Sequence, residues 1–232
     1  QGVFSIQTSS PAGEISDEQE VMQGKAIADS ALAAGIRHLV YSSSGAAGKA
    51  PTGMGHFDSK STIEDYLRAL PLSTTITRPA SFMEMMLLPG MGLNSGHFFF
   101  FMQRHQAMQM IALQDLGRIN AQILCNPERY RGQTLELASQ ALTGEDLQRA
   151  FSDAAGHPVH YHRFPDELLA QNTFLRQLTA LVDNGIVAGS ADIPALEQEF
   201  GMMMTLEQWL AGPARQSFNA ALNAPQANLV LR

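Results

Sequence analysis

The sequence contains one cysteine, Cys125, and this scarcity excludes two kinds of site. A single thiol cannot form an internal disulfide framework, and it cannot supply a multi-cysteine metal site. We expect Cys125 to lie on the buried face of a helix and to contribute packing only. The sequence therefore gives no reason to look for cysteine chemistry.

Long apolar segments are missing as well. No stretch approaches the roughly 20 apolar residues of a membrane-spanning helix, and the longest aromatic run is Phe98–Phe101. The chain does not begin with a basic segment followed by an apolar one, so the sequence predicts no signal peptide. We expect a cytoplasmic protein that has no membrane partner.

Basic residues are also few. The 232 residues include 15 Lys and Arg against 22 Asp and Glu, which gives a net charge of −7. Non-specific nucleic-acid binding needs clustered basic side chains, so direct nucleic-acid binding is not expected. Hydrophobic residues make up 45% of the chain, enough for one large domain or for one domain with a smaller companion.

The first third of the chain alternates between apolar β-type runs and amphipathic segments. The predicted strands are Gly2–Gln7, His38–Ser42 and Ser73–Thr77, and the helices between them are Val21–Ala34 and Ser59–Leu70. Their apolar residues recur at helical spacing. Strands joined through helices form right-handed crossovers, which make a sheet parallel. The sequence thus predicts an α/β fold with a partial Rossmann-type, doubly wound parallel sheet.

The rest of the chain predicts a smaller α/β subdomain. Its predicted strands are Met108–Leu113, Gln133–Ala138 and Val159–Phe164. Its predicted helices are one that Asp115 N-caps and that ends at Leu124, one that Thr143 caps and Gly156 closes, a long one over Asp166–Val182, and a last one that begins in Thr205–Leu210. We divide the chain into a nucleotide-binding part, residues 1–128 with a cleft loop over 83–107, and a substrate-side part, residues 129–232.

The glycine-rich turn that holds the pyrophosphate in doubly wound domains has no counterpart in this sequence. That turn follows a strand and opens a helix with the pattern G-x-G-x-x-G. Glycines at 45, 48, 53 and 55 lie between a predicted strand and a helix, but their spacing differs. We interpret them as a flexible loop, with a phosphate cradle as the alternative. We expect the chain to start just before the fourth strand of the sheet and to lack the preceding glycine-rich portion.

The stretch Ile36–Lys60 concentrates polar residues where a ligand is expected. A buried strand ends in Ser42, Ser43 and Ser44, and a glycine-rich loop then leads into a helix that carries His56 and Lys60. Ligands of open α/β sheets bind at the carboxyl ends of the strands. His56 and Lys60 are four residues apart, so they share one helical face.

Six stretches of the sequence carry a family resemblance. They are DEQEVMQGKAIADSALAAGIRHLVYSS, HFDSKSTIEDYL, TRPASFME, DLGRINAQIL, PERYRGQTLELAS and TLEQWL. In this order they resemble the NmrA-like proteins, which are atypical short-chain dehydrogenase/reductases. The resemblance implies a Rossmann fold that binds NADP(H), with NAD(H) as the alternative. It also implies hydride transfer to a small apolar, quinone-like acceptor.

Two other functions stay open at this stage. One is a non-catalytic NADP(H) sensor that regulates a protein partner. The other is a chain that binds no dinucleotide, because the glycine-rich turn is missing. An unpaired edge of the sheet also favours self-association, so a homodimer is a further prediction.

The resemblance assigns catalytic roles to three residues. His56 occupies the position of the tyrosine that donates a proton in the wider superfamily, and Lys60 corresponds to the lysine that holds the nicotinamide ribose. An imidazole can donate a proton near neutral pH, although the charge of Lys60 disfavours its protonated form. A hydrogen bond within the loop is the alternative role for His56. Ser43 corresponds to the serine that polarises a substrate carbonyl, with Ser44 fitting the same interval.

The resemblance also implies cofactor contacts elsewhere in the chain. They involve Thr8 and Ser9 after the first strand, Lys25 in the first helix, and the backbone of Phe82, Met83 and Glu84. A solvated helix lysine is the alternative for Lys25. Relatives usually have an asparagine after this glutamate, whereas this chain has Met85, so no side-chain contact is expected there.

Two further groups of residues invite a functional interpretation. His157, His160 and His162 suggest a metal, but no carboxylate or cysteine lies close in sequence, and solvent-facing strand histidines are the preferred interpretation. We therefore predict no metal site. The Met- and Phe-rich segment from Met83 to Met110 predicts a pliable wall of a cleft or part of the core.

Overall fold

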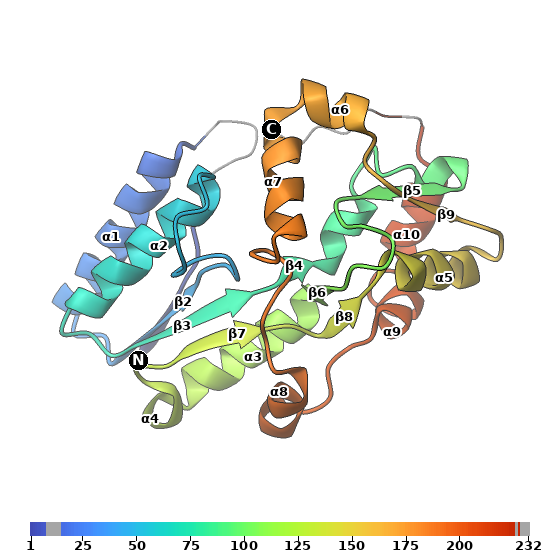
Figure 1. Cartoon of the computed structure of the whole chain (residues 1–232). Helices are drawn as coiled ribbons and strands as arrows, with labels where there is room; N and C mark the ends of the chain where they lie inside the picture. Colours follow the sequence, from blue (N-terminus) through green and yellow to red (C-terminus); the bar gives the residue numbers. More distant parts are fainter. Residues whose placement is uncertain (8–14, 226, 228–232) are drawn as a thin grey trace.

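A computed structural model describes residues 1–7, 15–225 and 227 of the chain (Figure 1). Its first half contains β1 (Gly2–Ser5), α1 (Asp17–Ala33), β2 (His38–Ser42), α2 (Gly55–Ala69), β3 (Thr74–Pro79), β4 (Ser81–Phe82), the 3₁₀ helices η1 (Met83–Leu87) and η2 (Leu93–Ser95), β5 (His97–Phe100) and β6 (Met108–Ile111). Its second half contains α3 (Leu113–Cys125), α4 (Pro127–Tyr130), β7 (Thr134–Leu137), β8 (Gln140–Leu142), α5 (Gly144–Ala155), β9 (His160–Arg163), α6 (Asp166–Gln171), α7 (Thr173–Asp183), α8 (Ile193–Phe200), α9 (Leu206–Ala211) and α10 (Arg215–Leu222).

The main sheet is parallel and confirms the predicted fold class. Its four strands lie in the order β1-β2-β3-β7, so β2 and β3 are central. Every residue of β2 is buried, as expected for a parallel strand that is covered on both faces. At its carboxyl end, Ser42 lies opposite Thr77 of β3.

Helices cover both faces of this sheet (Figure 1). On one face, α1 and α2 bury a cluster that includes Leu39 and Tyr41 of β2 and Ile63 of α2. On the other face, α3 packs Ile119 and Ile123 against Val40. Alternate residues of β2 therefore belong to two different cores, because successive side chains of a strand point to opposite faces.

A second and larger core forms beside the sheet. The chain leaves β3 at Ala80, whose N–H donates to Leu137, and continues into a small sheet of order β4-β6-β8. A two-stranded parallel sheet, β5-β9, lies farther out. Phe98, Phe151 and Trp209 are fully or almost fully buried between these strands and the surrounding helices. The Met- and Phe-rich segment therefore supplies core residues, as one of its two interpretations predicted.

Three local predictions were wrong. The helix expected over Asp166–Val182 is broken at Asn172, whose side chain accepts from the Leu175 N–H and N-caps α7. The N-cap of α3 is Ala112, because Asp115 uses its carboxylate to accept from Ser139 and from the Met204 N–H. Cys125 is exposed at the end of α3, off the apolar stripe of that helix.

The boundaries of α5 follow the predicted signals, whereas α1 begins at Asp17, before the predicted Val21. Ser16 and Gln19 form a capping box at the start of α1, and Thr143 and Asp146 form one at the start of α5. Gly156 closes α5 with a φ of 72°, in the left-handed region that glycine tolerates. No helix among the described residues is both long enough and apolar enough to cross a membrane.

Close contact between α1 and α2 leads to a testable prediction at Gly24. A Cβ added there would lie 2.7 Å from Ile63 Cδ1 and 2.8 Å from Ile63 Cγ1. Gly24→Ala should therefore lower the free energy of unfolding by about 1–2 kcal/mol, because the overlap outweighs the helix propensity that alanine gains. Urea denaturation followed by circular dichroism measures this loss.

Gly117 provides a matched control, since it lies inside α3 with no heavy atom within 4 Å of an added Cβ. Gly117→Ala should raise the free energy of unfolding by about 0.5–1 kcal/mol. Equal effects of the two substitutions would contradict the packing of Gly24 against Ile63.

Candidate functional site

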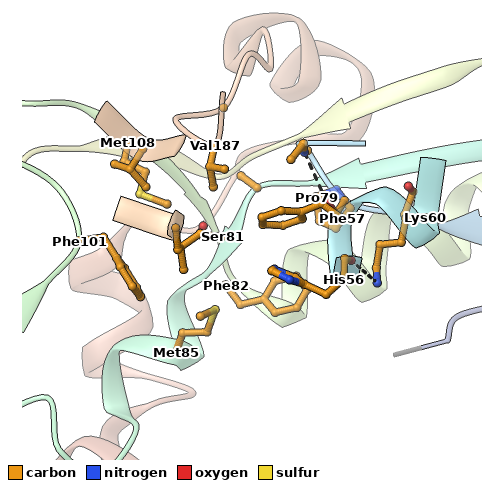
Figure 2. A pocket seen from close by; sticks show the side chains of 18 of the residues that line it. His56, Phe57, Lys60, Pro79, Ser81, Phe82, Met85, Phe101, Met108 and Val187 are labelled. Carbon is orange, nitrogen blue, oxygen red and sulfur yellow. Dashed lines mark hydrogen bonds between the residues drawn. The ribbon is translucent and has the colours of Figure 1, made fainter. Parts of the chain in front are cut away.

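A cavity of about 260 Å³ opens at the carboxyl ends of β2 and β3 (Figure 2). Its walls come from the loop after β2, the start of α2, the β3–β4 connection, the β5–β6 region, α7 and the loop after α7. The lining residues include Ser42, Ser43, Ser44, His56, Phe57, Lys60, Ser81, Phe82, Met85, Phe100, Phe101, Met108, Phe174, Leu178, Val182 and Val187. The predicted site at Ile36–Lys60 thus faces an apolar wall formed by distant parts of the chain.

His56 lies near the start of α2 beneath aromatic rings. Its ring centroid is 3.9 Å from that of Phe57 and 5.2 Å from that of Phe174. Burial and then the charge of Lys60 lower the pKa of His56 to about 4, against opposing charges of Asp17, Glu20 and Asp58. At neutral pH the imidazole is therefore uncharged, and it can donate only from a neutral N–H.

Lys60 is held in place by two acceptors. Its Nζ donates to Glu20 Oε1 over 2.6 Å and to the carbonyl oxygen of His56 over 3.1 Å, the second of which is drawn in Figure 2. Only 13% of the Lys60 side chain is exposed, and Glu20 is fully buried. An ammonium carries three N–H donors, so one donor of Lys60 remains for a ligand in the cavity.

The hydroxyl of Ser43 is already engaged. It donates to Glu64 Oε1 over 2.5 Å, and Glu64 also accepts two bonds from Arg78, of 3.0 and 2.6 Å. Burial raises the pKa of Glu64, but hydrogen bonds from Arg78 and Ser43 and the charge of Arg78 outweigh it and hold this pKa below its usual value. Glu64 therefore stays ionised and accepts the hydrogen bond that Ser43 donates.

Ser44 has a hydroxyl proton available at the cavity. Its Oγ accepts from the Ala46 N–H over 3.4 Å, which leaves its own O–H available. Ser42 also lines the cavity but is almost fully buried. The geometry favours Ser44 over Ser43 as the donor to a bound carbonyl oxygen.

The predicted cofactor contacts separate into three groups. Phe82 lines the cavity (Figure 2). Met85, where no side-chain contact was expected, lines it as well. The side chain of Met83 is buried in the larger core. Glu84 turns its carboxylate toward the Leu113 N–H and Trp209 Nε1, at 3.1 and 3.2 Å.

The remaining predicted contacts are Lys25 and the segment after β1. Lys25 Nζ lies 5.1 Å from the centroid of the Tyr66 ring, and Lys25 does not line the cavity. Thr8 and Ser9 lie outside the described residues. The structure therefore brings together Ser43, His56, Lys60 and Phe82 of the predicted residues.

Sequence reasoning missed three residues that shape the cavity. Glu20 and Glu64 occupy buried positions of amphipathic helices, with Gly24 and Leu67 on the same faces. An acidic residue on an otherwise apolar stripe is a signal that could have revealed both. Phe174 comes from α7, and nothing in its local sequence indicates that it contacts His56.

The histidines near β9 pack on one another. His97 Nδ1 lies 2.9 Å from His162 Nε2, whereas His160 is exposed. Burial and then the positive charges of His97 and His160 lower the pKa of His162. In the described part of the chain, no three His, Cys, Asp or Glu side chains are arranged to hold a metal ion.

Curated proteins match about three fifths of the chain. The chain is 25% identical to the NAD(P)H azoreductase of Xenophilus azovorans over 143 residues, which is 61% of this chain and 49% of that protein. The chain spans about half the length of the curated relatives that it matches.

Solved structures share the fold. NmrA, a negative transcriptional regulator solved in complex with NADP, aligns with a TM-score of 0.71 at 21% identity, over 94% of this chain and 75% of that one. The triphenylmethane reductase of Citrobacter sp., complexed with NADP(H), gives a TM-score of 0.69 at 16% identity, over 95% of this chain and 75% of that one. Both identities are low, so the likeness concerns the Rossmann-type fold.

The family assignment itself comes from the sequence. Residues 1–205 match the NmrA-like family, which is the family that the six sequence stretches indicated. This match includes the serines after β2, the start of α2 and the segment that leads from β3 into β4. The chain belongs to the NmrA-like family.

Proposed function

We propose that the chain acts in an NAD(P)H-dependent oxidoreductase and that the cavity brings a nicotinamide and a small apolar acceptor together. The observation that carries this proposal is the position of Lys60, which lines the cavity with one N–H donor left over. An apolar wall that includes Phe101, Met108 and Val187 lies across from it (Figure 2). A hydroxyl-bearing ligand and a flat apolar partner fit these two sides.

The residues of the chain would bind and orient, and the dinucleotide would supply the hydride when bound. Lys60 would donate to a ribose hydroxyl, and Ser44 would donate to a carbonyl oxygen of the acceptor. The aromatic wall would exclude water from the transfer path. With a pKa of about 4, His56 would be protonated in about one molecule in a thousand at pH 7, so it would serve as a neutral hydrogen-bonding group.

A second candidate is a dinucleotide sensor that performs no chemistry. The uncharged state of His56 and the hydrogen bond that Ser43 donates to Glu64 favour it, because both leave fewer proton donors for an acceptor in the cavity. A sensor needs the binding contacts of Lys60 but no proton donor. NADP(H) is the preferred ligand of both candidates, with NAD(H) as the alternative.

Titration of NADPH and NADH into the 232-residue chain tests the proposal. NADPH should bind, and Lys60→Ala should raise its dissociation constant about tenfold, since a charged hydrogen bond is lost. Lys25→Ala is the control, because Lys25 also lies on a helix but does not line the cavity, and it should change the dissociation constant less than twofold. Fluorescence or calorimetry measures both.

Oxidation of NADPH by a menadione-type quinone then distinguishes the candidates. Turnover supports the oxidoreductase, whereas binding without turnover of several apolar acceptors supports the sensor. Absence of binding by the unmodified chain would contradict both.

A further inference from the structure

A buried carboxylate from a different helix holds the lysine of the candidate site. Glu20 of α1 is fully buried, and its two oxygens accept from consecutive residues of α2. Lys60 Nζ donates to Oε1 over 2.6 Å, and Ser59 Oγ donates to Oε2 over 2.7 Å. Glu20 does not line the cavity, but Lys60 does.

The bond from Glu20 fixes a side chain that would otherwise be mobile. A lysine side chain has four rotatable bonds and loses much rotational freedom when a ligand immobilises it. In this chain Glu20 and the carbonyl oxygen of His56 take two of the three ammonium donors before any ligand arrives. The third donor is then presented from a fixed position, and prior fixation of this kind strengthens ligand binding.

A purely structural link between α1 and α2 would not need a charge at this position. Gly24, one turn farther along α1, already brings the helix against Ile63, and an apolar side chain could extend that contact. Burial of a carboxylate is costly unless the charge is paired and hydrogen-bonded. The ionic partner of Glu20 is the lysine at the cavity wall, which suggests a role in setting the position of that lysine.

We propose that Glu20 is a positioning residue that holds the Lys60 ammonium at the wall of the cavity, ready to bind a hydroxyl of the dinucleotide. The inference rests on the proposed function for the identity of the ligand. The position of Lys60 itself can be measured without any ligand.

The first experiment follows the lysine directly. Lys25, Lys49 and Lys60 are the lysines of the chain, so biosynthetic labelling with lysine that carries an isotope label at Cε gives one side-chain NMR signal for each and leaves every ammonium N–H in place. Lys60→Arg identifies the signal of Lys60. In the unmodified sequence this signal should lie away from that of exposed Lys49. Glu20→Asp keeps the charge but shortens the side chain by one methylene, which moves the carboxylate away from Lys60. Glu20→Gln keeps the shape but removes the charge. Both should move the Lys60 signal toward that of Lys49.

Ser59→Ala is the matched control. It removes the other bond to Glu20 from the same helix and leaves the Lys60 pair intact. The Lys60 signal should therefore stay in place, although the loss of a buried hydrogen bond lowers stability. An unmoved Lys60 signal in both Glu20 variants would overturn the proposal, as would an equal shift in Ser59→Ala.

The second experiment measures NADPH affinity in the same variants. Glu20→Asp should weaken binding about five- to tenfold, close to the effect of Lys60→Ala, whereas Ser59→Ala should change it less than twofold. Glu20→Asp is the decisive variant because it leaves the net charge unchanged, so a general change in attraction for an anionic ligand does not enter. Unchanged affinity in Glu20→Asp, alongside loss in Lys60→Ala, would overturn the functional part of the proposal.

Failure of the proposed function gives a different result. If the unmodified chain binds no NADPH but the Lys60 signal still moves in both Glu20 variants, the dinucleotide assignment is wrong and the positioning of Lys60 by Glu20 stands. If the signal does not move and NADPH binds, the positioning is wrong and the oxidoreductase proposal stands.

Discussion

Replacement of Arg78 by methionine should lower the free energy of unfolding by about 3–5 kcal/mol, because it removes the main cationic partner of the buried Glu64 carboxylate. The Arg78 guanidinium donates twice to Glu64 and once to Glu136, and only 12% of its side chain is exposed. Glu64 has no solvent exposure and would keep Arg68 as its only cationic partner among the described residues. Arg68 is 41% exposed, so its attraction is partly screened. Chemical denaturation at pH 7 measures the loss.

Two further variants show whether the unpaired Glu64 carboxylate causes this loss of stability. Arg68→Met removes a partner of the same carboxylate from the surface side and should lower stability by less than about 1 kcal/mol. Glu64→Leu combined with Arg78→Met removes both charges and should recover part of the loss, since Ser43 and Arg68 still lose their acceptor. If Arg68→Met and Arg78→Met lowered the free energy of unfolding by similar amounts, the burial of the Arg78–Glu64 pair would not explain the effect.

Removal of the Phe174 ring should raise the pKa of His56 by about one unit or more from its value of about 4. The ring lies 5.2 Å from the imidazole, and burial is the main cause that lowers this pKa. Phe174→Ala admits water to the imidazole, whereas Lys60 remains and keeps the pKa below its ordinary value. The imidazole signals recorded by NMR between pH 3 and pH 8, with His56→Asn for assignment, measure the shift.

The same change should alter how stability depends on pH. The folded-state pKa of His56 lies below its unfolded value of about 6.5, so its contribution is complete above pH 6.5 and is lost as pH falls toward 4. Phe174→Ala should reduce this loss. Leu178→Ala is the control, because Leu178 lines the same cavity from the next turn of α7. A pKa shift of equal size in this control would mean that general loosening of α7, rather than the Phe174 ring, exposes His56.

Sequence patterns correctly predicted those strands and helix caps that depend on neighbouring residues in the chain. The strand His38–Ser42 was predicted with its observed limits, since Leu39, Val40 and Tyr41 at its centre form a recognisable apolar run. The capping box of Thr143 and Asp146 was predicted because both partners lie within one helical turn. The parallel sheet followed from the alternation of strands and helices, which constrains the connections.

Long-range partners explain what the sequence did not reveal. Ser43 looked like a free hydroxyl, but its acceptor is Glu64, 21 residues away. Phe174 covers His56 from a helix far along the chain. The break at Asn172 was missed because an asparagine is compatible with a helix interior as well as with an N-cap, and tertiary packing decides between them.

One wall of the cavity comes from a helix that belongs to two separate hydrophobic cores, and this arrangement links ligand binding to the stability of the fold. Helix α2 sends Ile63 into the core beneath α1, whereas Phe57 of the same helix packs against the larger core that contains Leu178 of α7. A molecule bound between Lys60 and α7 would contact two helices: α2, which belongs to both cores, and α7, which belongs to the larger core. Separation of the two cores would first have to break those contacts, so a bound ligand would oppose it.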